Sequence, residues 1–149
     1  MEAQKRKTII LLAEDDEDDY LLAKDVFQDS EFPHDLRWVK DGEELMDYLS
    51  HRGRYQRGEE APRPAIILLD LNMPRKDGRE ALKEIKAHPE FRRIPVVVLT
   101  TSKAEEDVFR TYDLGANSFI RKPVGFNQYV NLVKTFERYW FEIVQLPTE

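Results

Sequence analysis

The sequence contains no cysteine, so it can form no disulfide, no thiolate metal site and no cysteine nucleophile. This composition favours a cytoplasmic protein. The chain also lacks any apolar run near the roughly 18 residues that a membrane-spanning helix needs, so we expect no membrane partner. Acidic residues are in excess, and the formal net charge is −6. That charge argues against direct binding of nucleic acid, because phosphate groups are bound by basic surfaces.

The N-terminal residues 1–7 are basic, but the apolar stretch after them is about six residues long and ends in acidic residues. Such a stretch is typical of a strand rather than of a signal peptide. The length of 149 residues suits one domain with a sizeable core. We therefore expect a single domain over residues 1–149.

Buried apolar strands alternate with amphipathic helices along the chain, which is typical of a parallel sheet with helices on both faces. The predicted strands are 8–13, 35–39, 65–69, 95–99 and 117–121. The predicted helices are 17–28, 42–51, 78–88, 103–113 and 126–144, and Gly115 is expected to cap the fourth. Right-handed crossovers then favour a flavodoxin-like α/β fold, a three-layer (βα)5 sandwich with strand order 2-1-3-4-5. Residues 51–64 are too long for an ordinary connection and should form a surface loop with several cationic side chains.

Acidic residues stand at the carboxyl ends of two predicted strands. Asp70 directly follows the apolar run 65–69, and Glu14 and Asp15 follow the first strand. In the order 2-1-3-4-5 these strands are neighbours, so the three acids should converge at the edge where open parallel sheets bind ligands. Carboxylates, with the backbone carbonyl of Asn72, are oxygen ligands of the kind that Mg²⁺ takes. The sequence therefore predicts a magnesium site in which Asp70 can accept a phosphoryl group.

A simpler interpretation of the acidic run 14–19 is a solvated helix start, where negative charge favours the helix dipole. Asp16 would then serve only as the cap, and Asp18 and Asp19 would only be solvated. A calcium loop fits poorly, because the run lacks the central glycine and the terminal glutamate at the required spacing. Neither interpretation explains Asp70, since an acid that closes an apolar strand has no packing role.

Thr100 and Lys122 follow the fourth and fifth predicted strands and should lie on the same rim as Asp70. A lysine there can bind a phosphoryl oxygen as a point charge, and a threonine hydroxyl can donate a hydrogen bond to another. Taken singly, residues 100–102 fit a helix cap, Lys122 fits a surface lysine and Phe119 fits core packing. Taken together, four of the five strands end in a residue suited to a phosphoryl–metal site.

In chain order, these residues resemble the signature of response-regulator receiver domains: Glu14-Asp15, Asp70, Asn72-Met73-Pro74, Asp77-Gly78, Thr100, Phe119 and Lys122-Pro123. The resemblance covers about residues 8–140. It implies that Asp70 accepts a phosphoryl group from a sensor histidine kinase in a Mg²⁺-dependent reaction. It also implies a signalling protein that acts through conformational change of its own surface, and not an enzyme.

The same resemblance implies a role for each site residue. Glu14 and Asp15 would form the acidic pair, with Asp15 the more direct Mg²⁺ ligand, and Asn72 would add its backbone carbonyl. Thr100 and Lys122 would bind phosphoryl oxygens.

Two further features belong to the same resemblance. Phe119 would be the switch aromatic that responds together with Thr100. The Lys122-Pro123 peptide bond would be cis.

The chain is also similar to single-domain regulators that are paired with bacterial and cyanobacterial phytochromes. The similarity lies in the loop 51–64, the run 71–78, residues 99–102 and residues 139–141. It implies a phytochrome as the partner kinase. Thr101 departs from many receivers, which carry Ala or Ser after the switch threonine. A bulkier side chain there can hinder access to the phosphoryl group and alter its lifetime.

The last predicted helix is long and carries apolar residues beyond one stripe. Its predicted core face holds Tyr129, Leu132, Val133, Phe136, Trp140 and Ile143, and the residues off that face are Val130, Phe141 and Val144. The second patch predicts a homodimer through the C-terminal helix region, unless the last strand and the preceding loop cover it. Because few residues of the sequence follow this helix, we expect no separate output domain.

Three other functions compete with the phosphoacceptor hypothesis. A Mg²⁺-dependent phosphohydrolase with Asp70 as nucleophile commonly needs a second acid two residues later, where Asn72 cannot transfer protons. A pseudo-receiver used only for binding is disfavoured by the complete set of acids. Histidine phosphotransfer is disfavoured because His34, His51 and His88 fall in predicted loops or helix ends.

Overall fold

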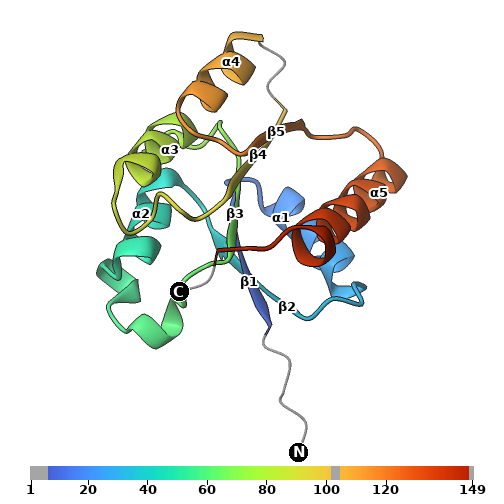
Figure 1. Cartoon of the computed structure of the whole chain (residues 1–149), viewed down its shortest axis with the longest axis horizontal. Coiled ribbons are helices and arrows are strands. Elements are labelled where there is room, and N and C mark those ends of the chain that lie inside the picture. The colour runs from blue at the N-terminus through green and yellow to red at the C-terminus, as the bar shows by residue number, and fades with distance from the viewer. Residues whose placement is uncertain (1–6, 102–104, 148–149) are drawn as a thin grey trace, which may run out of the picture.

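The computed structural model describes residues 7–101 and 105–147. Five parallel strands form one sheet in the order β2-β1-β3-β4-β5, which confirms the predicted flavodoxin-like order (Figure 1). The strands are β1 (Thr8–Ala13), β2 (His34–Val39), β3 (Ile66–Leu69), β4 (Val96–Thr100) and β5 (Ser118–Arg121). Each predicted strand is present with ends that differ by at most one residue.

Helices cover both faces of this sheet, as the alternating pattern predicted. On one side lie α1 (Glu17–Gln28) and α5 (Phe126–Glu137), and on the other lie α2 (Gly42–Ser50) and α3 (Gly78–Ala87) (Figure 1). The remaining helix, α4 (Glu105–Asp113), runs beside the β5 edge. Part of the helix predicted over 103–113 lies outside the described residues.

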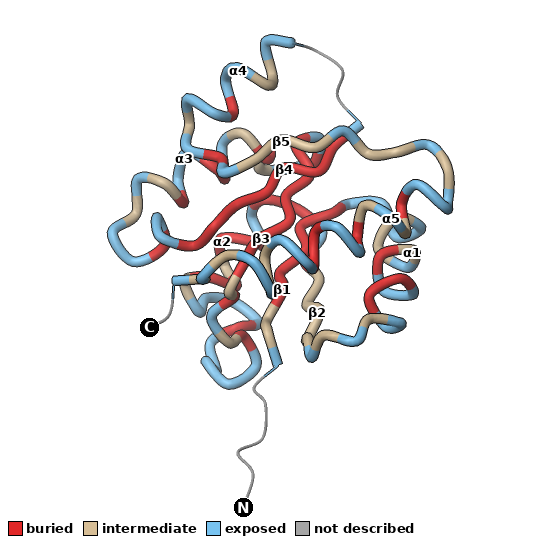
Figure 2. The backbone as a smooth tube through the Cα atoms, turned by 45° about the vertical axis from the view of Figure 1, so that its right-hand side comes forward, coloured by how far each residue is buried: buried red, intermediate tan, exposed pale blue. Residues whose placement is uncertain are grey.

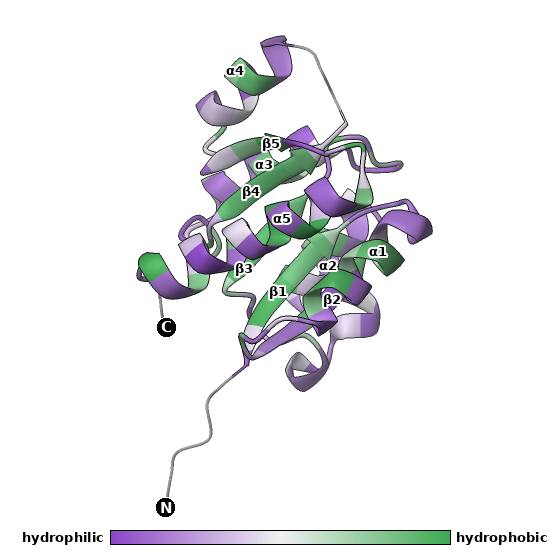
Figure 3. Ribbon diagram, turned by 90° about the vertical axis from the view of Figure 1, so that its right-hand side faces the viewer, coloured by the Kyte–Doolittle hydropathy of each residue, from purple (hydrophilic) through white to green (hydrophobic). Residues whose placement is uncertain are grey.

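The central strands are buried on both faces (Figure 2). Every residue of β3 and β4 is buried, whereas Val39 is the only buried residue of the edge strand β2. Successive side chains of a strand point to opposite faces. Leu11 therefore packs with the α2–α3 side, while Ile10 packs with the α1–α5 side. Figure 3 shows strands β1 and β4 as hydrophobic, and helices such as α5 with hydrophobic and hydrophilic residues in alternation.

The loop 51–64 is ordered by contacts with α2. It contains two short 3-10 turns, η1 (Gly53–Tyr55) and η2 (Gly58–Glu60). Tyr55 is buried, and its hydroxyl donates a hydrogen bond of 2.8 Å to a carboxylate oxygen of Glu44. The expected cationic side chains are exposed, namely Arg52, Arg54, Arg57 and Arg63. The prediction of a surface loop is thus confirmed, and the loop also contributes to the core.

Helix α5 continues beyond Glu137 as a π-helical segment, η3 (Arg138–Ile143). A π-helix brings residues five apart onto one face. Phe136 and Phe141 accordingly pack with their ring centroids 5.9 Å apart and their planes nearly perpendicular. The prediction that Ile143 belongs to the core face is wrong, because Ile143 is 66% exposed. The change of helical period turns Phe141 inward in its place.

Gly115 ends α4 as predicted. Its φ angle is +108°, a backbone conformation that a side chain disfavours, and its amide donates to the carbonyl of Tyr112 at 3.0 Å. A Cβ at this position would lie 2.8 Å from Cγ of Lys86. This turn leads directly into the start of β5.

Candidate functional site

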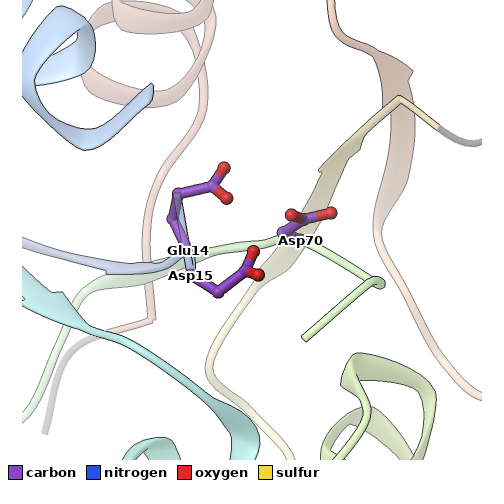
Figure 4. A group of neighbouring side chains, drawn as sticks. All are labelled: Glu14, Asp15 and Asp70. Atoms are coloured by element: carbon purple, nitrogen blue, oxygen red, sulfur yellow. The ribbon is translucent and has the colours of Figure 1, made fainter. Parts of the chain in front are cut away.

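Three carboxylates meet where β1 and β3 leave the sheet (Figure 4). One carboxylate oxygen from each of Glu14, Asp15 and Asp70 lies within 4.8 Å of the other two. They converge because β1 and β3 are adjacent and parallel, with Ala13 opposite Leu69, so that both chains leave the sheet at one level. Clustered carboxylate oxygens are the ligands of hard divalent cations. This donor set therefore fits Mg²⁺, as predicted.

Asp70 is only 6% exposed, and short-range contacts hold it in place. Its backbone amide donates to the carbonyl of Ala13 at 3.0 Å, and its Oδ1 accepts from the amide of Asn72 at 3.3 Å. The start of α3 presses against it, since a Cβ on Gly78 would lie 2.3 Å from the Asp70 carbonyl oxygen. Only glycine permits this close approach. The loop after β3 is thereby packed tightly beneath the carboxylate.

Thr100 ends β4 and is fully buried. Its hydroxyl donates a hydrogen bond of 3.0 Å to Oδ1 of Asp70, so the predicted neighbourhood of these two residues is observed. The helix cap expected at 100–102 lies partly outside the described residues. Thr101 is exposed, and its effect on the phosphoryl group stays a prediction.

Lys122 follows β5 and reaches over the same rim. Its ammonium group pairs with Glu14, lies 2.8 Å from Oδ2 of Asp19, and lies 3.7 Å from Oδ2 of Asp70. The backbone amide of Lys122 donates to the carbonyl of Thr100 at 2.8 Å, which continues the pairing of β4 with β5. Sequence reasoning therefore placed this lysine correctly.

The prediction of a cis peptide bond between Lys122 and Pro123 is wrong, because the described residues include no cis peptide bond. The trans form is the intrinsically favoured one, by about 0.5–1 kcal/mol for a bond that precedes proline. With the trans bond the lysine side chain already spans the distance to the acids.

Burial shapes the electrostatics of this cluster. Removal from water raises the pKa of Glu14 to about 8; the hydrogen bond from Lys122 opposes this rise and the charge of Asp70 adds to it. Burial would lower the pKa of Lys122, but hydrogen bonds to Asp19 and Glu14 outweigh it and hold that pKa above its ordinary value. Lys122 is thus a firmly charged cation among acids, one of which resists ionisation.

Phe119 lies on β5, opposite Val98 of β4, and is partly buried against the α2–α3 side of the core. Its backbone amide donates to the hydroxyl of Tyr112 on α4 at 3.2 Å. This contact links the strand to the neighbouring helix. The structure thus places Phe119 between β4 and α4. Its role as a switch residue stays a prediction. The metal-binding role of the Asn72 carbonyl also stays a prediction.

Two neighbours of the site were missed by sequence reasoning. Asp19, interpreted as merely solvated, contacts Lys122. Trp38 on β2 donates from its indole nitrogen to the backbone carbonyl of Glu14 at 2.7 Å. Tyr20 stacks on Trp38 with ring centroids 4.0 Å apart, and the ammonium of Lys40 lies 5.2 Å from that ring. The contact of Trp38 with Glu14 could have been suspected only from its place near the end of a predicted strand, next to the strand that carries the first acids.

Comparisons with known proteins agree with this geometry. The sequence profile of the response regulator receiver domain matches residues 10–134. The response regulator Rcp1 of Synechocystis is 45% identical over 139 residues, which cover 93% of this chain and 92% of Rcp1. Within the described residues, no helix combines the length and the apolar character that crossing a membrane requires.

Two solved structures are similar over nearly the whole chain. The crystal structure of the phosphorylated cyanobacterial phytochrome response regulator RcpA has a TM-score of 0.89 and 44% identity, and covers 96% of this chain and 100% of RcpA. The Mn²⁺-bound form of Rcp1 has a TM-score of 0.87 and 44% identity, and covers 95% of this chain and 99% of that one.

Proposed function

The chain belongs to the response regulator receiver domain family, and on this premise we propose that Asp70 is the residue that accepts a phosphoryl group from a sensor histidine kinase. The family acts in two-component signalling and binds a divalent metal. The observation that carries the assignment to Asp70 is its position: a buried carboxylate with a threonine hydroxyl at 3.0 Å, a lysine ammonium at 3.7 Å and two further acids close by.

In the proposed reaction a carboxylate oxygen of Asp70 attacks phosphorus, and the bond from phosphorus to the donor's leaving group breaks. The Thr100 hydroxyl and the Lys122 ammonium then bind oxygens of the transferred group. Glu14, Asp15, Asp70 and the Asn72 carbonyl would hold Mg²⁺, which would supply positive charge to offset the acids and the incoming group. The reaction is accelerated mainly by positioning and charge neutralisation, because the protein itself performs little covalent chemistry.

Phosphorylation would act as a local electrostatic switch. The added charge at Asp70 draws the Thr100 hydroxyl toward the phosphoryl oxygens, and Phe119 then repacks beside α4. The altered surface passes the signal on. We further propose that residues 1–149 form a single receiver domain. We also propose that the protein is located in the cytoplasm and does not bind nucleic acid directly.

The test is incubation with Mg²⁺ and acetyl phosphate, followed by intact mass spectrometry. We expect the mass to increase by one phosphoryl group in the wild type and in Asp18→Asn, an exposed acid on the same edge, but not in Asp70→Asn. A phosphoryl label that survives Asp70→Asn would refute the assignment. Turnover of small phosphate esters would instead favour a phosphohydrolase; with Asn72 two residues after Asp70, we expect only slow self-dephosphorylation.

For the partner, we propose a phytochrome with histidine kinase activity. The support is the likeness to RcpA, which is described as a cyanobacterial phytochrome response regulator. Phosphotransfer from a panel of sensor kinases, phytochromes included, tests this proposal. Faster labelling by unrelated kinases than by every phytochrome of the panel would contradict it.

We also propose a homodimer through the C-terminal helix region. The apolar side chains exposed there support it, namely Val124, Phe126, Tyr139 and Ile143. Size-exclusion chromatography with light scattering at micromolar concentration should give twice the chain mass. A single monomer peak at that concentration would rule the dimer out.

A further inference from the structure

The ammonium group of Lys122 is held between two acids before any phosphoryl group is present. One of its carboxylate partners is Glu14 and another is Oδ2 of Asp19 at 2.8 Å. Asp70 lies farther away, with its Oδ2 at 3.7 Å, which is longer than a hydrogen bond. An ammonium has three donors, so two are engaged away from the residue that receives the phosphoryl group.

The first turn of α1 places Asp19 in this position. Asp16 caps the helix, and its Oδ1 accepts from the amides of Asp18 and Asp19 at 2.9 and 3.3 Å. That cap fixes the turn, so the side chain of Asp19 faces Lys122 while Asp18 is exposed. In the part of the chain that the structure describes, the ion pairs of Lys122 are with Glu14, Asp19 and Asp70.

We propose that Asp19 is a positioning residue that competes with the phosphoryl group for Lys122. This inference rests on the proposed function of Asp70. To bind a phosphoryl oxygen, the ammonium must come within about 2.7–2.9 Å of it, the length of a charge-assisted hydrogen bond. It must therefore loosen its contact with Asp19, so Asp19 weakens the binding of a phosphoryl group at Asp70.

The competition has a defined sign and size. Removing the charge of Asp19 frees Lys122 and should tighten phosphoryl binding. The side chain of Asp19 is 42% exposed, so water screens its charge and the effect is modest, about threefold in affinity. Asp19→Asn keeps the size and the helical position of the side chain, so the fold should be retained.

The experiment measures the affinity of the Mg²⁺-loaded protein for beryllofluoride, a non-covalent analogue of the phosphoryl group, by ¹⁹F NMR. We expect Asp19→Asn to bind about threefold more tightly than the wild type. Asp18→Asn is the matched control, because it removes an equal charge one residue away without touching Lys122, and it should change the affinity little.

A double-mutant cycle with Lys122→Met separates competition for the lysine from simple repulsion between charges. In the Lys122→Met background, Asp19→Asn should no longer tighten binding. The same cycle by urea unfolding in EDTA provides a readout without metal or analogue. There Asp19→Asn should destabilise the wild type more than it destabilises Lys122→Met; Lys122→Gln serves if the methionine variant does not fold.

The outcomes distinguish this inference from the proposed function. Equal tightening in Asp18→Asn, or tightening that persists without Lys122, would overturn the competition and leave Asp70 as phosphoacceptor. An unchanged affinity in Asp19→Asn would also overturn it. If wild-type protein binds no beryllofluoride in Mg²⁺, the proposed function fails, and the competition falls with it.

Discussion

The two ends of the sheet each hold a partly buried lysine, and the two lysines have opposite surroundings. At the amino ends of the strands, Lys86 donates to the carbonyl oxygens of Arg92 and Ile94 at 3.0 and 2.8 Å, and burial lowers its pKa. At the carboxyl ends, Lys122 faces carboxylates, and its pKa is raised.

The difference separates a structural polar contact from a functional one. Carbonyl oxygens of the backbone cannot move away or change charge, so Lys86 ties α3 to the start of β4. Carboxylates can ionise, bind a cation or be phosphorylated, so the partners of Lys122 can change. A buried lysine among acids therefore indicates a functional site, whereas a buried lysine among backbone carbonyls indicates a structural contact.

Exchanging each lysine for methionine should give the largest contrast. Lys122→Met removes a charged hydrogen-bond donor to the phosphoryl group, and we expect the beryllofluoride affinity to fall about tenfold or more. Lys86→Met should lower the free energy of unfolding by about 1 kcal/mol and leave that affinity unchanged. ¹⁹F NMR and urea unfolding measure the two quantities. Equal loss of affinity in both variants would contradict the distinction.

A pair of glycines extends the comparison. A Cβ on Gly78 would meet the backbone of Asp70 and Leu71 at 2.3 and 2.7 Å, so Gly78→Ala must shift the loop that carries Asp70. We expect a loss of about 1–3 kcal/mol in the free energy of unfolding together with slower labelling by acetyl phosphate.

Gly115→Ala is the control at the other end. The variant is strained by the positive φ at this position, and the three atoms nearest to its Cβ belong to the flexible side chain of Lys86, so it should destabilise the protein without slowing the labelling. Thermal unfolding and the labelling rate are measured on the same samples. Slowed labelling in Gly115→Ala would show that destabilisation alone accounts for the effect of Gly78→Ala.

The pH dependence of metal binding tests the contrast in another way. Burial raises the pKa of Glu14 to about 8, so between its ordinary value of 4.5 and about 8 the folded, metal-free protein holds a proton that the unfolded chain releases. The Glu14 contribution to stability therefore falls as pH rises through this window and is constant above it. Mg²⁺ must displace that proton, so its affinity should rise with pH up to about 8 and then level off.

Titration of Mg²⁺ by calorimetry at several pH values checks this expectation. Glu14→Gln should flatten the rise above pH 6. Glu137→Gln is the control, since burial also raises the pKa of Glu137, but its partner is Ser30, which follows the C-terminal end of α1, whereas the acids precede the N-terminal end. A pH dependence that persists in Glu14→Gln would assign the proton to another group.

The smallest expected effect concerns the two tryptophans. Trp38→Phe removes the hydrogen bond to the Glu14 carbonyl, and we expect Mg²⁺ affinity to fall about fivefold, equivalent to about 1 kcal/mol. Trp140→Phe, which changes a half-buried ring on η3, should leave that affinity unchanged. Calorimetry measures both. Equal affinities in wild type and Trp38→Phe would mean that Glu14 is held without the indole.

Most of the fold and the centre of the site were predictable from local patterns. Apolar runs that end at Glu14, Asp70 and Thr100 mark three strands and the rim together, and a shorter apolar pair, Phe119-Ile120, precedes Lys122. The rule that neighbouring parallel strands end at one edge then brings these residues together. The inward turn of Phe141 was missed, because the ordinary helical period does not foresee a π-helical segment.

The sequence by itself determined which residues form strands and which polar groups follow them, because burial and strand periodicity are properties of short segments. Only the tertiary structure decided that Asp19 contacts Lys122, 103 residues away, and that Trp38 supports Glu14. The first contact depends on how the first turn of α1 sits against the chain after β5, and the second depends on how the end of β2 sits against the chain after β1. That placement results from packing of the whole core, and no short segment encodes it.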